Sequence, residues 1–227
     1  MAITYYPDMI QGSDEWFAAR CGMLASSGMK LIITPKTLKP SKNDKASSYL
    51  YELLAQRITR YVEPQYVSED MLRGTEDEIV ARQLYQENFA PVQTVGFVTN
   101  DKWGFTIGYS PDGLVGDDGL IECKSRRQKF QAETIISGEV PEEHVIQIQT
   151  GLMVTGRKWC DYISYCRGMP MAVIQVYPDE KVMQAIVDAA SILEERLAEL
   201  MQDYNAALAS GARFIPTERR TSQEMYV

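Results

Sequence analysis

Apolar residues recur at helical spacing in two long stretches of the chain. Over 46–62 one helical face carries Leu50, Leu53, Leu54, Ile58 and Val62, and this pattern predicts an amphipathic helix. Over 179–208 apolar residues seven apart form a stripe that favours packing on a sheet or, alternatively, a subunit seam. Further helices are predicted over 13–20, with Ser13 as N-cap, and over 28–33, 70–88 and 142–155.

Short apolar runs between these helices have the length and alternation of strands. They cover about 93–99, 104–109, 119–125, 159–166 and 171–177. Residues 34–43, with two prolines and no periodicity, are expected to form a loop, and 210–227 an irregular tail. Helices before, between and after the strands predict an α/β (α+β) fold. At 227 residues, one domain spanning 1–227 is expected.

Residues 110–124 read as a strand, a turn and a second strand. Glu122 and Lys124 alternate with apolar residues and leave one face of the second strand. We expect that face to avoid the core, because burying unpartnered charge is costly. The turn over 116–119 folds the chain back and brings Asp112 close to Glu122. Paired carboxylates beside a lysine indicate Mg²⁺ binding and metal-assisted phosphodiester hydrolysis.

Composition and charge narrow the function classes. The four cysteines form no C-x-x-C pair and His144 is the single histidine, which argues against a zinc finger and against triad-type acyl chemistry. The net charge of −8 argues against a surface that is basic all round, but a basic groove can coexist with it. No apolar run approaches the ~20 residues of a membrane helix, and no signal peptide is apparent. A cytoplasmic protein without membrane partners is expected.

The acid–lysine pattern also resembles a known signature. Pro111-Asp112, followed by Glu122-Cys123-Lys124, is similar to the P-D…(D/E)-x-K motif of restriction-endonuclease-like nucleases. Neighbouring blocks, in the same order as in lambda-type exonucleases, make the resemblance more specific. They are Trp16…Arg20, Gly22, Ala25-Ser26-Ser27, Gly74…Glu78…Ala81-Arg82, Ser110-Pro111-Asp112-Gly113-Leu114 and Gln147-Ile148-Gln149 before Met153-Val154-Thr155. Over about 13–160, the chain resembles the lambda-exonuclease-like (YqaJ) viral recombinase and alkaline exonuclease family.

The resemblance implies a restriction-endonuclease-like core with a central mixed β-sheet flanked by helices. It also implies a Mg²⁺-dependent 5′→3′ exonuclease that degrades linear double-stranded DNA and leaves 3′ single strands for phage-type recombination. The implied partners are a duplex with a 5′-phosphorylated end, two further copies of the chain in a homotrimeric ring, and a single-strand annealing protein.

The family's metal site maps onto named residues. Asp112 would bridge two Mg²⁺ ions, for which Mn²⁺ is a possible substitute, Glu122 and the main-chain carbonyl of Cys123 would hold one ion, and Glu78 the other. Lys124 would orient or deprotonate the attacking water, and Gln147 would position Lys124 or the water.

The family's 5′-phosphate site maps onto Arg20, Ser27 and Ser110, because an arginine with hydroxyls holds a phosphate by charge-assisted hydrogen bonds. A further arginine corresponds to Arg126 or Arg127, and the sequence leaves the choice open. The adjacent Ser26 and Ser27 hydroxyls are alternatively a simple helix cap. His144 is expected to pack structurally rather than to catalyse.

Two other functions are consistent with the same sequence features. A restriction-type or repair endonuclease would use the same core chemistry, and a non-catalytic module for binding DNA ends in recombination would retain the fold. The presence of every metal-site residue argues against the non-catalytic module.

Overall fold

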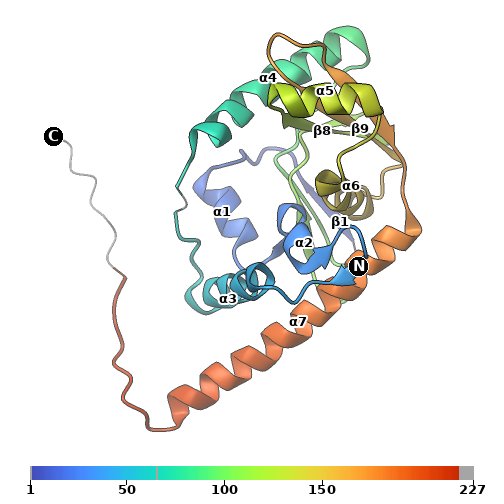
Figure 1. Cartoon of the computed structure of the whole chain (residues 1–227). Coiled ribbons are helices and arrows are strands. Elements are labelled where there is room, and N and C mark those ends of the chain that lie inside the picture. The colour runs from blue at the N-terminus through green and yellow to red at the C-terminus, as the bar shows by residue number, and fades with distance from the viewer. Residues whose placement is uncertain (1, 65, 220–227) are drawn as a thin grey trace, which may run out of the picture.

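Two four-stranded mixed sheets form the centre of the structure, a computed structural model that describes residues 2–64 and 66–219 (Figure 1). The first sheet has the order β1-β5-β6-β2 and the second the order β10-β9-β8-β7. The strands of the first are β1 (Ile3–Tyr6), β2 (Leu24–Ala25), β5 (Phe97–Asn100) and β6 (Ile107–Tyr109). Those of the second are β7 (Gly113–Val115), β8 (Gly119–Ser125), β9 (Trp159–Tyr165) and β10 (Ala172–Val176). A small hairpin pairs β3 (Ile33–Thr34) with β4 (Lys39–Pro40).

Helices cover both faces of these sheets. They are α1 (Asp14–Arg20), α2 (Ser26–Ile32), α3 (Asp44–Thr59), α4 (Glu69–Asn88), α5 (Gln128–Ser137), α6 (Glu142–Thr155) and α7 (Glu180–Ala209). Figure 1 shows α4 and α5 on one side of β8 and β9, and α6 on the other. Ser13, Asn43 and Ser68 cap α1, α3 and α4, each accepting a hydrogen bond from a main-chain amide of the first turn.

Two apolar cores lie on the opposite faces of the second sheet. The larger contains Leu120 of β8 and Tyr162 of β9 together with side chains of α2, α3, α6 and α7. The smaller contains Ile121 and Cys123 of β8, packed against Ala81 and Tyr85 of α4. Because consecutive residues of a strand face opposite sides, β8 contributes to both cores.

The long helix α7 packs along the larger core and contacts α3 (Figure 1). Val182, Ile186, Leu193 and Leu197 are buried on its inner face. Arg57 of α3 forms a two-armed ion pair with Glu194 of α7, with N–O distances of 2.7 and 2.6 Å, and also donates to the Gly22 carbonyl. Through Arg57, helix α7 thereby supports the segment around Gly22 that leads into α2.

The predicted fold class is confirmed, with its strands divided between two sheets. The helix predicted over 142–155 coincides with α6, and α1, α2, α4 and α7 lie within a few residues of their predicted ranges. The helix over 46–62 instead ends at Thr59, because Arg60 adopts a left-handed conformation (φ 54°), so Val62 lies outside it. Residues 34–43 are not wholly loop, since they contain β4 and part of β3.

Five elements were not predicted: the strands β1, β2, β3 and β4 and the helix α5. The expected irregular tail holds over 210–219, and its remaining residues, 220–227, lie outside the described part of the chain. No helix in that described part is both long and apolar enough to cross a membrane.

Candidate active site

The turn between β7 and β8 places Asp112 opposite Glu122. The two strands pair antiparallel with Gly113 facing Ile121, so the residue before Gly113 comes beside the residue after Ile121. The Cys123 amide donates to Asp112 Oδ2 at 2.6 Å, which fixes the carboxylate against the strand. The predicted convergence of Asp112 and Glu122 is therefore present.

Glu122 is buried, with a side chain only 1% exposed. Its Oε2 accepts a hydrogen bond from the Tyr109 hydroxyl at 2.8 Å, and its Oε1 accepts from Lys124 Nζ at 2.6 Å. The expectation that this face of β8 avoids the core was wrong. The cost of burial is offset because both carboxylate oxygens have a donor.

Glu78 comes from α4, which packs over β8. Its Oε1 accepts from Arg82 Nη1 at 3.0 Å, and the same nitrogen donates to the Asp112 carbonyl at 3.0 Å. Arg82 therefore joins α4 to the loop that carries Asp112. Arg82 was not predicted as a site residue, although its i,i+4 spacing from Glu78 is a signal for the ion pair.

The three carboxylates influence one another electrostatically. Burial, followed by the charges of Glu122 and Glu78, raises the pKa of Asp112 well above its ordinary value. Burial also raises the pKa of Glu78, Arg82 opposes this shift, and Glu122 adds to it. Nearby like charges disfavour the ionised form of these carboxyls, and a divalent cation among them would favour it.

Lys124 lies beside this cluster as an ammonium ion. Burial alone would lower the pKa of Lys124, but the Glu122 and Asp112 charges and the hydrogen bond to Glu122 outweigh burial and raise it above its ordinary value. A protonated lysine donates hydrogen bonds and cannot accept a proton. In this arrangement Lys124 is suited to orienting a water or a phosphate oxygen.

The residues present fit a divalent metal in their chemistry. Oxygen ligands from carboxylates are those that Mg²⁺ prefers, and Asp112 Oδ1 and Glu78 Oε2 make no hydrogen bond to a described residue. The Cys123 thiol belongs to the smaller core, which leaves only its main chain for the site. Across residues 2–64 and 66–219, no three His, Cys, Asp or Glu side chains already stand in a metal-binding arrangement.

His144 lies in the N-terminal half of α6, where burial and then the charge of the nearby Lys124 lower the pKa of its imidazole. His144 stacks on Tyr162 with ring centroids 5.5 Å apart, and Tyr162 is the β9 partner of Glu122 in the parallel register. Gln147, predicted to position Lys124 or the water, is one helical turn further along and half-buried. Among the described residues no hydrogen bond joins its side chain to Lys124, whose partner is Glu122.

The predicted phosphate-binding residues Arg20, Ser27 and Ser110 come together. Arg20 donates to Ser110 Oγ at 2.9 Å and to Ser27 Oγ at 3.4 Å, and it stacks 4.0 Å from the centroid of Trp16. The Trp16 indole also donates to Ser110 Oγ, at 2.9 Å. Burial lowers the pKa of Arg20 to about 10, so its guanidinium is charged at neutral pH. Ser110 of this cluster precedes Asp112 by two residues in the sequence.

Arg126 and Arg127 point to different partners. The Arg126 side chain, 10% exposed, bonds Glu143 at 2.8 Å and His144 Nε2 at 3.0 Å. The Arg127 side chain, 64% exposed, bonds both Asp70 oxygens. Neither arginine contacts Arg20, Ser27 or Ser110.

The chain is similar to known proteins over most of its length. The YqaJ-like viral recombinase domain matches residues 15–158, more than half of the 227 residues. The chain belongs to the YqaJ-like viral recombinase family. The predicted resemblance is confirmed, and family membership supports a phage-type exonuclease.

Solved structures similar to this YqaJ-like chain include an alkaline exonuclease, LHK-Exo, from Laribacter hongkongensis. It is 32% identical with a TM-score of 0.77, and the match covers 87% of this chain and 98% of that chain. LHK-Exo in complex with dAMP matches over the same shares, at 33% identity and a TM-score of 0.77. A phage related exonuclease from Haemophilus somnus 129PT shares the fold at 14% identity and a TM-score of 0.59, over 80% of this chain and 96% of that chain. No curated protein matches this chain significantly.

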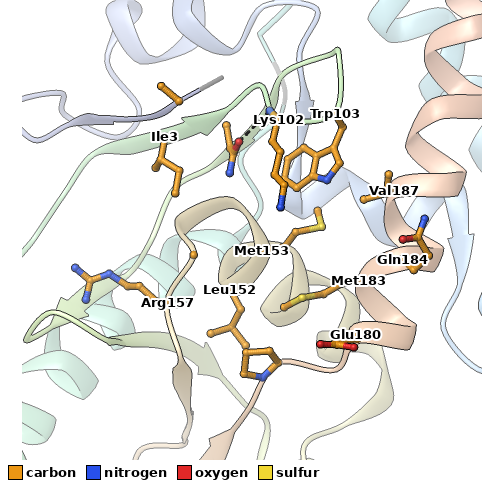
Figure 2. Close-up of a pocket in the computed structure, with 14 residues that line it drawn as sticks. Ile3, Lys102, Trp103, Leu152, Met153, Arg157, Glu180, Met183, Gln184 and Val187 are labelled. Atoms are coloured by element: carbon orange, nitrogen blue, oxygen red, sulfur yellow. Dashed lines mark hydrogen bonds between the residues drawn. The ribbon is translucent and has the colours of Figure 1, made fainter.

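A cavity of about 600 Å³ lies at the opposite, C-terminal end of α6 in the YqaJ-like fold (Figure 2). Trp103 and Lys102 border it from the segment after β5, and Met183 and Glu180 from α7. Glu180 is the single carboxylate among its lining residues in the described part of the chain. The cavity therefore lacks the paired acids needed for metal-assisted hydrolysis.

His144 predicts a pH dependence of stability in this family member. Burial and the charge of Lys124 lower the pKa of His144 from 6.5 to about 3. Below pH 6.5 the unfolded chain binds a proton at His144 that the folded chain does not, so stability falls as pH decreases toward about 3. His144→Gln, which retains a hydrogen-bond acceptor for Arg126, should reduce the stability lost between about pH 7.5 and pH 5 by ~2 kcal/mol. Urea unfolding of both proteins at pH 7.5 and pH 5 measures this loss of stability. An equal loss in the wild type and in His144→Gln would contradict the prediction.

Proposed function

We propose that the protein is a Mg²⁺-dependent 5′→3′ exonuclease that degrades linear double-stranded DNA and leaves 3′ single strands for phage-type recombination. The observation that carries this proposal is a connection through the chain. Ser110, which accepts from Arg20, precedes Asp112 by two residues, and Asp112 in turn is bonded to the strand that carries Glu122 and Lys124. A site that anchors a terminal phosphate next to a hydrolytic centre favours cutting from an end. The similarity to LHK-Exo, an alkaline exonuclease also solved with dAMP, supports the same class.

Asp112, Glu122 and Glu78 would hold the metal, with Asp112 between two Mg²⁺ ions and the Cys123 carbonyl beside Glu122. Bound Mg²⁺ would supply Lewis-acid activation of water and stabilise the charge of the leaving oxygen. Mn²⁺ is a possible substitute, since it accepts the same oxygen ligands.

The side chains themselves hold and orient the reactants. Arg20, Ser27 and Ser110 would bind the 5′-terminal phosphate through charge-assisted hydrogen bonds. Lys124, held by Glu122, would donate to the attacking water or to a phosphate oxygen, and Gln147 would orient the same water through its amide. Tyr109 and Arg82 would fix the positions of Glu122 and of the Asp112 loop.

We also propose a homotrimeric ring and a single-strand annealing protein as partner, on the basis of family membership. Native mass measurement tests the first, because a trimer has three times the 25.7 kDa mass of the chain. Copurification with a coexpressed annealing protein tests the second.

Digestion of end-labelled DNA tests the proposed activity. Linear duplex with a 5′ phosphate should be degraded in Mg²⁺ and remain intact in chelator, while a covalently closed circular duplex should remain intact in both. Cleavage of the circle would instead indicate a restriction- or repair-type endonuclease. No cleavage together with binding to ends would indicate a non-catalytic module.

Arg20→Gln is expected to reduce the preference for 5′-phosphorylated over 5′-hydroxyl ends. A hydrogen bond to a charged group contributes about 1.5–3 kcal/mol, so the preference should fall by ~10-fold or more. The measurement is the ratio of initial digestion rates on the two duplexes. Arg196→Gln, on the exposed part of α7, is the charge-matched control and should keep the ratio. An unchanged ratio in Arg20→Gln would contradict the assignment.

A further inference from the structure

A groove of about 560 Å³ lies where β8 ends and α5 begins. Among the described residues that line it, five are cationic: Arg73, Arg126, Arg127, Lys129 and Arg167. One lining residue, Asp77, is acidic. In a chain with a net charge of −8, this concentration of positive charge indicates a site for an anionic ligand.

The groove begins at the end of β8, the strand that carries Glu122 and Lys124, and is separate from the Arg20–Ser27–Ser110 cluster. Arg126 follows Lys124 by two residues, and its amide donates to the Tyr165 carbonyl of β9 at 2.7 Å. Ser125 donates to Asp77 at 2.6 Å and accepts from Arg73 at 3.3 Å, so the end of β8 forms part of the groove's frame. Arg20, Ser27 and Ser110 do not line the groove.

Helix α5 directs its N-terminus at this groove. Its N-cap, Arg127, makes no side-chain capping bond, and Gln128 and Lys129 of its first turn are lining residues. Free amides and the helix dipole favour an anion there. A second feature agrees: Arg126, nine-tenths buried in the same groove, has an Nε with no hydrogen-bond partner among the described residues.

The carboxylates that now pair with the groove's arginines are easily displaced. Asp70 and Glu76 pair with exposed arginines and have side chains 53% and 68% exposed, and exposed ion pairs of this kind contribute about 0–1 kcal/mol. Glu143, the partner of the buried Arg126, is itself 62% exposed. A phosphate can take their place, because arginine binds it through two parallel hydrogen bonds. Asp77 differs, since it is buried and bonds Arg167 Nε at 2.6 Å, so it orients that arginine.

We propose, on the basis of the proposed function, that this groove binds the phosphodiester backbone of a single DNA strand beside the active site. Its volume is in the range of about 300–1,000 Å³ typical of small-molecule sites. That space suits a short stretch of one strand rather than a duplex.

Salt dependence of binding tests the proposal. The double variant Arg127→Gln/Lys129→Gln changes two exposed side chains, and the protein is titrated with a fluorescent oligothymidylate in chelator at several salt concentrations. Each phosphate contact contributes about 0.7 to the slope of log K against log salt for single strands. The slope of the double variant should therefore be shallower than that of the wild type by ~1.4.

The matched control is Lys158→Gln/Arg196→Gln, which removes the same charge from exposed ion pairs outside the groove. It should keep the wild-type slope. The proposal is overturned if the groove variant keeps that slope, if the control loses as much, or if the wild type does not bind the single strand.

The activity assay separates the two proposals. If the wild type digests linear duplex and the groove variant keeps the wild-type salt slope, the groove proposal alone is wrong. If the wild type digests no DNA, the exonuclease proposal is wrong. The salt slopes for binding of the single strand, measured in chelator, still test the groove.

Discussion

Asp112→Asn is expected to abolish digestion of linear duplex DNA while duplex binding remains. Asparagine has the same shape and its oxygen still accepts from the Cys123 amide, so the turn between β7 and β8 should be preserved. The lost charge is that of the carboxyl whose pKa is raised by burial and by the charges of Glu122 and Glu78. Losing one electrostatic stabiliser of a transition state costs about 10²–10³ in rate, and losing a bridging metal ligand should cost at least that. Single-turnover digestion in Mg²⁺ measures the effect.

Asp117→Asn is the matched control for this change. Asp117 is exposed in the turn before β8, so its substitution removes the same charge a few residues away and should leave the digestion rate intact. Thermal unfolding adds a second readout. Mg²⁺ should raise the melting temperature of the wild type and of Asp117→Asn, because a ligand of the folded state stabilises it. Mg²⁺ should not raise the melting temperature of Asp112→Asn. A digestion rate near that of the wild type in Asp112→Asn would show that Asp112 is not part of the site.

Lys124→Met is expected to lower both activity and stability. Methionine fills similar space but leaves the buried Glu122 with Tyr109 as its remaining hydrogen-bond donor. Removing one partner of a buried ion pair typically costs about 3–5 kcal/mol. Because the Lys124 side chain is 24% exposed, we expect a loss of ~2–3 kcal/mol in the free energy of unfolding. Urea unfolding in chelator measures it.

The double variant Glu122→Gln/Lys124→Met separates pairing from catalysis. If the pair explains the loss, adding Glu122→Gln should restore most of the stability and none of the activity. Lys158→Met, at an exposed pair with Asp118, should change stability by less than ~1 kcal/mol. Strictly additive stability losses at 122 and 124 would show that the two side chains do not act as a pair.

Local signals in the sequence were sufficient for much of the architecture. The bounds of α6 follow from the acidic pair Glu142-Glu143 at its start and Gly156, with φ 67°, at its end. The turn over 116–119 fixes the register of β7 and β8, and the register brings Asp112 to Glu122. Resemblance to a family supplied what spacing could not, namely that Arg20, Ser27 and Ser110 belong together.

Other features depend on residues distant in the sequence. The burial of Glu122 is tolerated because the Tyr109 hydroxyl, from a strand of the other sheet, completes its hydrogen bonds. The protonated state of Lys124 likewise depends on two carboxylates, one of them across the turn. Helix α5 has neither an acidic first turn nor a side-chain cap, so its start carries no helix signal in the sequence.

The pairing of β8 has a consequence for how much of the chain makes up a working unit. The family match ends at residue 158, and β9, the parallel partner of β8, begins at Trp159. Helix α7, which covers the larger core and holds Arg57 through Glu194, lies later still. A polypeptide cut back to the matched region would leave the acid-bearing strand with an open edge and a bare apolar surface. The C-terminal third, although outside the family match, thus supplies both the strand that pairs with β8 and the helix that covers the larger core.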